Sequence, residues 1–107
     1  MMTESDQILL DAGVFIGGLL KGDPRHEEAR PLVEAARSGA LNACTTTSIL
    51  SEVYAALTWV RAQPQHLPSE AAEAVRLLIE PPSAIQILSD GLETSLRMLE
   101  WSERYGH

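Results

Sequence analysis

Cysteine and basic residues are scarce in this sequence, and both shortages limit what the protein can be. Cys44 is the only cysteine among the 107 residues, which excludes an intrachain disulfide and a cysteine-rich zinc site. We expect Cys44 to be a small buried apolar residue. Eight lysines and arginines against fifteen aspartates and glutamates give a net charge of −7. This balance argues against nucleic-acid binding by bulk electrostatic attraction and leaves only a localised site open.

Long apolar runs are also absent. No window of about 18 residues is continuously apolar, and the first six residues lack the basic region of a secretory signal. The sequence therefore predicts no membrane segment and a cytoplasmic location. Apolar residues still make up 45% of the chain, with a mean hydropathy of −0.04, as in soluble globular proteins. The length predicts a single domain over residues 1–107.

Short apolar runs alternate with longer helical patterns along the chain. Strands are predicted at residues 7–10, 40–45 and 84–88. Capping and stop signals predict helices at about 12–20, 23–39, 46–60, 69–79 and 90–106. The predicted helix caps are Asp23 followed by Pro24, the hydroxyl cluster at 45–48, Ser69 and Asp90, and the predicted stop of the second helix is Gly39. Two further expectations are a kink at Pro31 and a buried stripe on the third helix formed by Ile49, Leu50, Val53, Leu57 and Val60.

The order of these elements predicts the fold class. Strand and helix alternate, and no hairpin turn separates two strands. Such an order favours right-handed crossovers and a parallel sheet covered by helices, so the class is predicted to be α/β.

Two acidic residues fall where ligands bind in such folds, beyond the carboxyl ends of the strands. Asp11 is predicted as the last residue of the first strand, and Glu52 in the first or second turn of the helix after the second strand. Glu52 flanks the apolar stripe, where a carboxylate can be half buried. Two close carboxylates repel unless a divalent cation lies between them, and Mg²⁺ or Mn²⁺ suits oxygen ligands. The alternatives are a helix cap at Asp11 and stabilisation of the helix dipole by Glu52.

Three segments resemble one protein family. Residues 8–16 (ILLDAGVFI) are similar to the opening strand of PIN-domain proteins, where an apolar run ends in an aspartate followed by two small residues. Residues 22–29 (GDPRHEEA) resemble the stretch that follows, and residues 45–53 (TTTSILSEV) carry Glu52 at the place of the family's second acidic residue. The resemblance covers nearly the whole chain and looks closest to VapC-type toxins of toxin–antitoxin pairs.

This resemblance implies a three-layer α/β/α parallel sheet and a Mg²⁺- or Mn²⁺-dependent endoribonuclease. It implies that Asp11 and Glu52 hold the metal and are the catalytic residues, with a water activated by the ion attacking the RNA phosphate. It also implies a cognate antitoxin partner and a homodimer.

The sequence departs from the family at its C-terminal end. The family's third and fourth acidic residues have no counterpart before His107, so the fold is expected to be incomplete relative to the family. Asp90 is interpreted as a helix cap and not as a substitute. This departure supports an alternative function, a non-catalytic PIN-like module that pairs with itself or with an antitoxin, in which residues 8–10 form an exposed sheet edge.

Other polar and aromatic residues have weaker interpretations. A basic cluster could meet an RNA backbone, although a solvated face is favoured; it comprises Lys21, Arg25, His26 and Arg30. The three histidines, His26, His66 and His107, lack metal-ligand spacing and are expected to face solvent. For Tyr54, Trp59 and Trp101, packing in the core or at an interface is favoured over base stacking.

Overall fold

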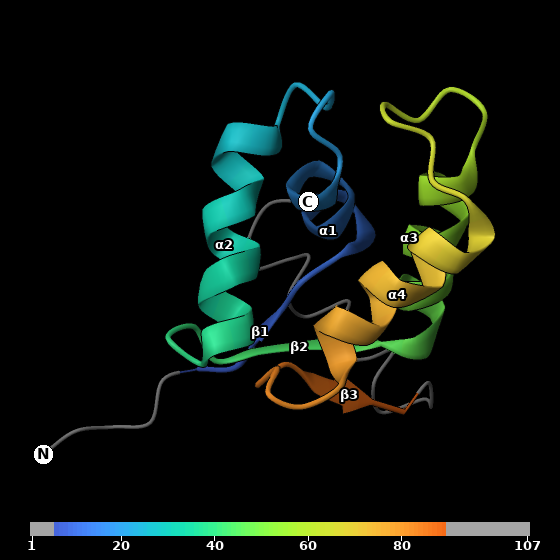
Figure 1. The fold of residues 1–107 in the computed structure, drawn as a ribbon. Helices are drawn as coiled ribbons and strands as arrows, with labels where there is room; N and C mark the ends of the chain where they lie inside the picture. Colours follow the sequence, from blue (N-terminus) through green and yellow to red (C-terminus); the bar gives the residue numbers. More distant parts are fainter. Residues whose placement is uncertain (1–5, 90–107) are drawn as a thin grey trace, which may run out of the picture.

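The fold was obtained as a computed structural model that describes residues 6–89 (Figure 1). Within this range lie strands β1 (Ile8–Leu9), β2 (Ala43–Thr46) and β3 (Gln86–Leu88), and helices α1 (Ala12–Leu19), α2 (His26–Ser38), α3 (Thr47–Thr58) and α4 (Pro68–Ile79). In Figure 1 the strands lie toward the bottom of the view and the helices above them, with α1 between α2 and α3. The helix predicted at 90–106, which includes Asp90 and Trp101, lies outside the described residues, and so does His107.

The three strands form one parallel sheet in the order β1-β2-β3, which confirms the predicted α/β class. Leu9 pairs with Cys44, and Cys44 pairs in turn with Gln86. The second strand begins three residues later than predicted. After α2 the Leu41 N–H donates to the Ala35 carbonyl at 3.0 Å, so residues 39–41 form a helix-terminal turn and cannot join the sheet.

Helix α2 begins two residues later than predicted, at His26. Asp23 does not cap it, because the Asp23 carboxylate accepts the Arg25 N–H at 2.8 Å and its carbonyl accepts the His26 N–H at 2.9 Å, closing a turn that precedes the helix. The helix continues through Pro31 and ends, as predicted, at Gly39. Gly39 has φ +88°, a left-handed conformation in which glycine is the least strained residue.

Helix α3 is capped as predicted by the hydroxyl cluster, since Thr46 Oγ1 accepts the Ile49 N–H at 3.2 Å. The predicted stripe of α3 is buried except for Val60, which is 73% exposed because the helix ends at Thr58. The prediction of Ser69 as the cap of α4 is wrong. Glu70 instead accepts the Leu67 N–H at 2.8 Å, and the helix begins at Pro68.

The core lies between the sheet and the packed helices, and α1 contacts both α2 and α3. Gly18 permits the close approach of α1 to α2, because a Cβ at this position would lie 2.7 Å from Val33 Cγ2. Cys44 is fully buried, as predicted. The largest buried side chains include Phe15, Leu57, Leu78 and Val53.

Tyr54 and Trp59 were predicted to pack in the core or at an interface, and the core alternative is wrong because both lie on the surface, while packing at an interface stays a prediction. Tyr54 is 38% exposed and Trp59 is 58% exposed, because Tyr54 falls outside the buried stripe of α3 and Trp59 follows its last turn. Among residues 6–89, no helix is long and apolar enough to cross a membrane.

Candidate metal centre

The carboxyl ends of β1 and β2 lie next to each other at one edge of the sheet and are linked by hydrogen bonds. Because the two strands are parallel neighbours, the chain leaves both of them at this edge. The Leu10 N–H donates to the Cys44 carbonyl at 2.9 Å, and the buried Thr45 hydroxyl donates to the Leu10 carbonyl at 3.3 Å. The backbone immediately before Asp11 is therefore fixed to the end of β2, from which α3 begins.

The sequence predicted Asp11 to be the last residue of the first strand, and this is wrong. Asp11 lies two residues beyond the end of β1. Its carboxylate caps α1, since Oδ1 accepts the Val14 N–H at 3.1 Å. The alternative structural role is thus confirmed for one oxygen. Asp11 is exposed, and a carboxylate has a second oxygen and further lone pairs, so capping and metal binding are compatible.

Glu52 lies in the second turn of α3, within the predicted range. It is exposed and not half buried, because the buried stripe of α3 is narrow and leaves Ser51, Glu52, Tyr54 and Ala55 on the solvent side. Among residues 6–89 the Glu52 side chain makes no hydrogen bond or ion pair. Glu52 is therefore a residue whose replacement would leave the core intact.

The chemistry of these two residues fits a hard divalent cation. Mg²⁺ prefers oxygen ligands, retains several waters and is commonly held by one or two carboxylates together with substrate phosphates. Asp11 and Glu52 supply two such carboxylates, each accessible to solvent. Among residues 6–89, no group of three or more histidine, cysteine, aspartate or glutamate side chains could form a larger ligand set. Asp11 and Glu52 therefore suit a metal ion whose other ligands are water molecules and substrate phosphate oxygens.

A cation lies near Asp11 that belongs to the predicted basic cluster, for which a solvated face was favoured over contact with an RNA backbone. Arg25 forms a two-point ion pair with Asp23, with Nε 3.0 Å from Oδ1 and Nη2 3.1 Å from Oδ2. The hydrogen bonds from Arg25 lower the pKa of the Asp23 carboxyl, and the same pair raises the pKa of Arg25. The charge of Asp11 raises the pKa of Arg25 further. The closeness of Asp23 and Arg25 around Pro24 was the available sequence signal.

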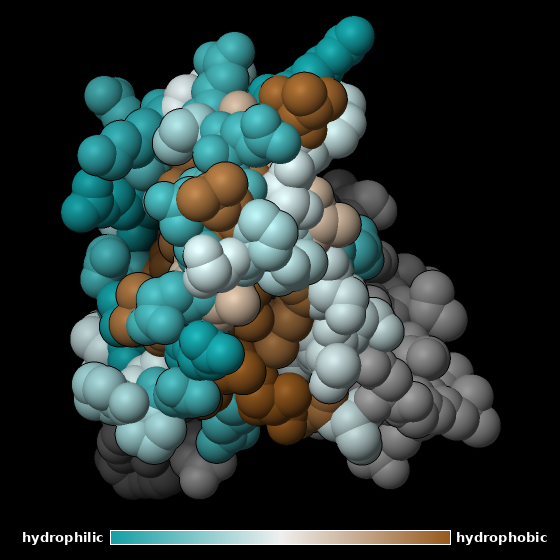
Figure 2. Space-filling model, turned by 45° about the vertical axis from the view of Figure 1, so that its right-hand side comes forward, coloured by the Kyte–Doolittle hydropathy of each residue, from teal (hydrophilic) through white to brown (hydrophobic). Residues whose placement is uncertain are grey.

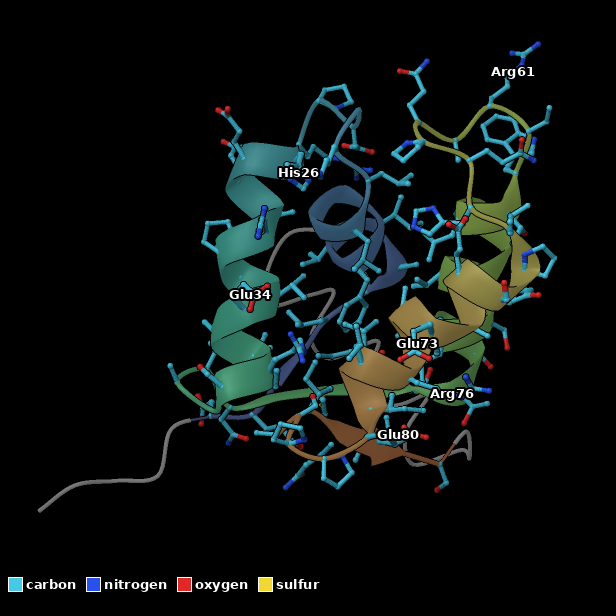
Figure 3. The ribbon with its side chains drawn as sticks, viewed as in Figure 1. His26, Glu34, Arg61, Glu73, Arg76 and Glu80 are labelled. Atoms are coloured by element: carbon cyan, nitrogen blue, oxygen red, sulfur yellow. The ribbon has the colours of Figure 1, made fainter. Side chains whose placement is uncertain are left out.

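The other basic residues of the predicted cluster differ from Arg25. Lys21 and Arg30 are exposed, as expected of a solvated face. The prediction that the histidines face solvent is wrong for both described ones, which are half buried. His26 Nδ1 donates to the Gly17 carbonyl at 2.9 Å, joining α2 to α1 (Figure 3), and His66 Nδ1 donates to the Pro64 carbonyl at 3.1 Å. Each ring therefore has a structural role.

Comparison with known proteins gives a consistent match. The sequence model of the PIN domain family matches residues 8–106. The structure is similar to that of the Mycobacterium tuberculosis protein VapC20, which is described as a toxin that cleaves the sarcin–ricin loop. The TM-score is 0.58 at 16% sequence identity, over 94% of this chain and 68% of VapC20, which establishes a likeness of fold. No curated protein matched the sequence.

Proposed function

Because the chain belongs to the PIN domain family, we propose that it hydrolyses RNA phosphodiester bonds at a Mg²⁺ or Mn²⁺ ion held by Asp11 and Glu52. The observation that supports this proposal most is the origin of the two carboxylates. Asp11 caps the start of α1 and Glu52 lies on α3, and these two helices follow neighbouring parallel strands at one edge of the sheet. The two residues are far apart in the sequence, and the hydrogen bonds between β2 and the segment before Asp11 hold these two parts of the chain together.

The residues have distinct tasks in this proposal. Asp11 and Glu52 would hold the divalent ion, which when bound would supply the hydrolytic chemistry by polarising a phosphate and lowering the pKa of a water. Asp11 is oriented by its hydrogen bond from Val14, which restricts the side chain to the rim of the sheet. Glu52 would bind the ion from α3, the helix whose first turn is fixed by the Thr46 cap. The protein thus contributes oriented charge on rigid elements rather than a protein nucleophile.

The proposal extends to the biological setting. VapC20 is described as a toxin, and we propose that this chain likewise acts on RNA as a toxin in the cytoplasm, as a single domain over residues 1–107. A cognate antitoxin would hold it inactive, and a homodimer would be its assembled form.

The direct test is an RNA cleavage assay on the purified chain. A sarcin–ricin-loop hairpin and a single-stranded RNA of mixed sequence serve as substrates, with Mn²⁺ or with a chelator, beside an Asp11→Asn variant. We expect cleavage by the wild type with Mn²⁺ and its loss both in chelator and in the variant. Equal cleavage by the two proteins, or none by either, would refute activity at this site.

A second candidate function is a non-catalytic module that pairs with itself or with an antitoxin. It is favoured by the small ligand set among residues 6–89 and by the position of β1 at the edge of the described sheet. Figure 2, which brings the α3 and α4 side forward, also shows apolar surface among the polar residues. Exposed apolar side chains include Trp59, Val60, Leu67 and Leu77. A wild type that fails to cleave RNA but sediments as a dimer would favour this function.

A further inference from the structure

We propose that Arg25 is a phosphate-binding residue of the candidate metal centre, where its Nη1 contacts a backbone phosphate of the bound RNA beside Asp11. This inference rests on the proposed ribonuclease function and assigns a residue that the family resemblance did not. It begins from the geometry of the Arg25–Asp23 pair.

Asp23 fixes the guanidinium group of Arg25 in one orientation. Its carboxylate accepts from both Nε and Nη2, at 3.0 and 3.1 Å, in the two-point geometry typical of arginine–carboxylate pairs. Asp23 Oδ1 also accepts the backbone N–H of Arg25 at 2.8 Å, so the same carboxylate holds both ends of the residue. The side chain of Asp23 is only 13% exposed, which limits its own movement.

The third nitrogen, Nη1, lies beside Gly13, the glycine that Asp11 also borders. A Cβ built on Gly13 would lie 3.1 Å from Arg25 Nη1 and 3.4 Å from Asp11 Oδ1. The cation and the carboxylate thus both lie near the same glycine, where no side chain fills the space between them, and they form no ion pair with each other. Asp23 occupies the donors on Nε and Nη2, and the structure shows no hydrogen bond from Nη1 to any residue between 6 and 89. Two N–H donors therefore remain at the candidate centre.

An RNA phosphate is the ligand that this arrangement fits. A divalent ion on Asp11 would repel Arg25, and an anion shared by the two cations removes that repulsion. Phosphate has this charge and offers several acceptor oxygens, which arginine binds well because of its fixed donor geometry. The chain carries a net charge of −7, so RNA requires a localised cation at the point of contact. Arg25, whose side chain is 55% exposed, supplies one.

The test compares Arg25→Gln with Arg30→Gln in the RNA cleavage assay. Both variants remove one positive charge at the start of α2, but the Arg30 side chain is exposed and makes no hydrogen bond or ion pair within residues 6–89. We expect Arg25→Gln to raise KM for RNA about 10-fold, as for loss of a charged hydrogen bond. The Mn²⁺ concentration that gives half of the maximal cleavage rate should stay equal or fall in Arg25→Gln, because the substitution removes a positive charge near the ion. Arg30→Gln should change neither quantity.

A second variant, Gly13→Ala, separates contact with RNA from the structural role of the ion pair. Its methyl group would lie 3.1 Å from Arg25 Nη1 and shift that nitrogen by a few tenths of an ångström, while its 3.4 Å distance from Asp11 Oδ1 is an ordinary contact. Asp23 and the charge of Arg25 remain, and alanine favours helices more than glycine does. We expect it to raise KM in the same direction as Arg25→Gln. The salt dependence of KM should weaken in Arg25→Gln by about 0.7 in log–log slope, the contribution of one phosphate contact on single-stranded RNA.

The outcomes distinguish this inference from the proposed function. A wild type that shows no Mn²⁺-dependent cleavage overturns the proposed function and this inference with it. A wild type that cleaves, with KM unchanged in Arg25→Gln, overturns only the assignment of Arg25. A parallel loss of Mn²⁺ binding and of RNA binding in Arg25→Gln would show that the ion pair merely shapes the centre, and would overturn it also.

Discussion

Replacing Leu78 by alanine is expected to lower the free energy of unfolding by about 3 kcal/mol. Leu78 is 1% exposed and belongs to the core cluster, on the face of α4 that packs toward α3. Truncation removes apolar contacts and leaves a cavity that the surrounding helices cannot fill completely. For a domain of this size the loss corresponds to a fall in Tm of about 15 °C, measured by circular dichroism.

The neighbouring residue provides a matched control for this prediction. Leu77 is 51% exposed on the same helix, so Leu77→Ala makes the same chemical change without opening a cavity. We expect its effect to stay below about 1 kcal/mol, since surface substitutions are usually small. Urea unfolding of both variants gives the comparison. Equal destabilisation by the two would contradict the position of α4 in the fold.

Replacing Glu52 by glutamine is expected to lower Mn²⁺-dependent RNA cleavage at least about 100-fold, or about 2.7 kcal/mol of transition-state stabilisation. Replacing residues that merely support metal ligands already costs about 10- to 100-fold, so loss of a ligand's charge should cost more. The free energy of unfolding should not fall, because Glu52 is exposed on α3. Initial rates at saturating Mn²⁺ measure the effect.

Glu73→Gln is the matched control for Glu52. Glu73 is also an exposed acid within a helix, and its ion pair with Arg76 at 3.4 Å is of a kind that contributes little to stability (Figure 3). We expect the rate of Glu73→Gln to equal that of the wild type. If both variants cleave RNA at the wild-type rate, Glu52 does not hold the ion.

The class of fold followed from the sequence because local signals agreed with one another. The apolar runs, the hydroxyl cluster at 45–48 and Gly39 each predicted the element that forms. The start of α2 was less predictable, because the residue that looked like its cap makes other hydrogen bonds. Asp23 was a good cap by residue type, yet its carboxylate bonds the next turn and Arg25, and that partner depends on side-chain geometry.

The candidate site was predictable in part. Topology alone brings Asp11 and Glu52 toward one edge, because parallel strands end together. The exposure of Glu52 and the position of Arg25 over Gly13 depend on how α1, α2 and α3 pack, which no local pattern encodes. The same limit explains the surface positions of Tyr54 and Trp59, since residue type alone does not reveal where a helix ends.

Titration of the chain with Mn²⁺ by isothermal calorimetry tests the shared metal centre most directly. The wild type should bind one ion, and Asp11→Asn and Glu52→Gln should each weaken binding. Once either ligand is lost, loss of the other should matter less, so the double variant should bind little more weakly than the single ones. Equal Mn²⁺ affinity in the wild type and both single variants, or no binding by the wild type, would contradict the account.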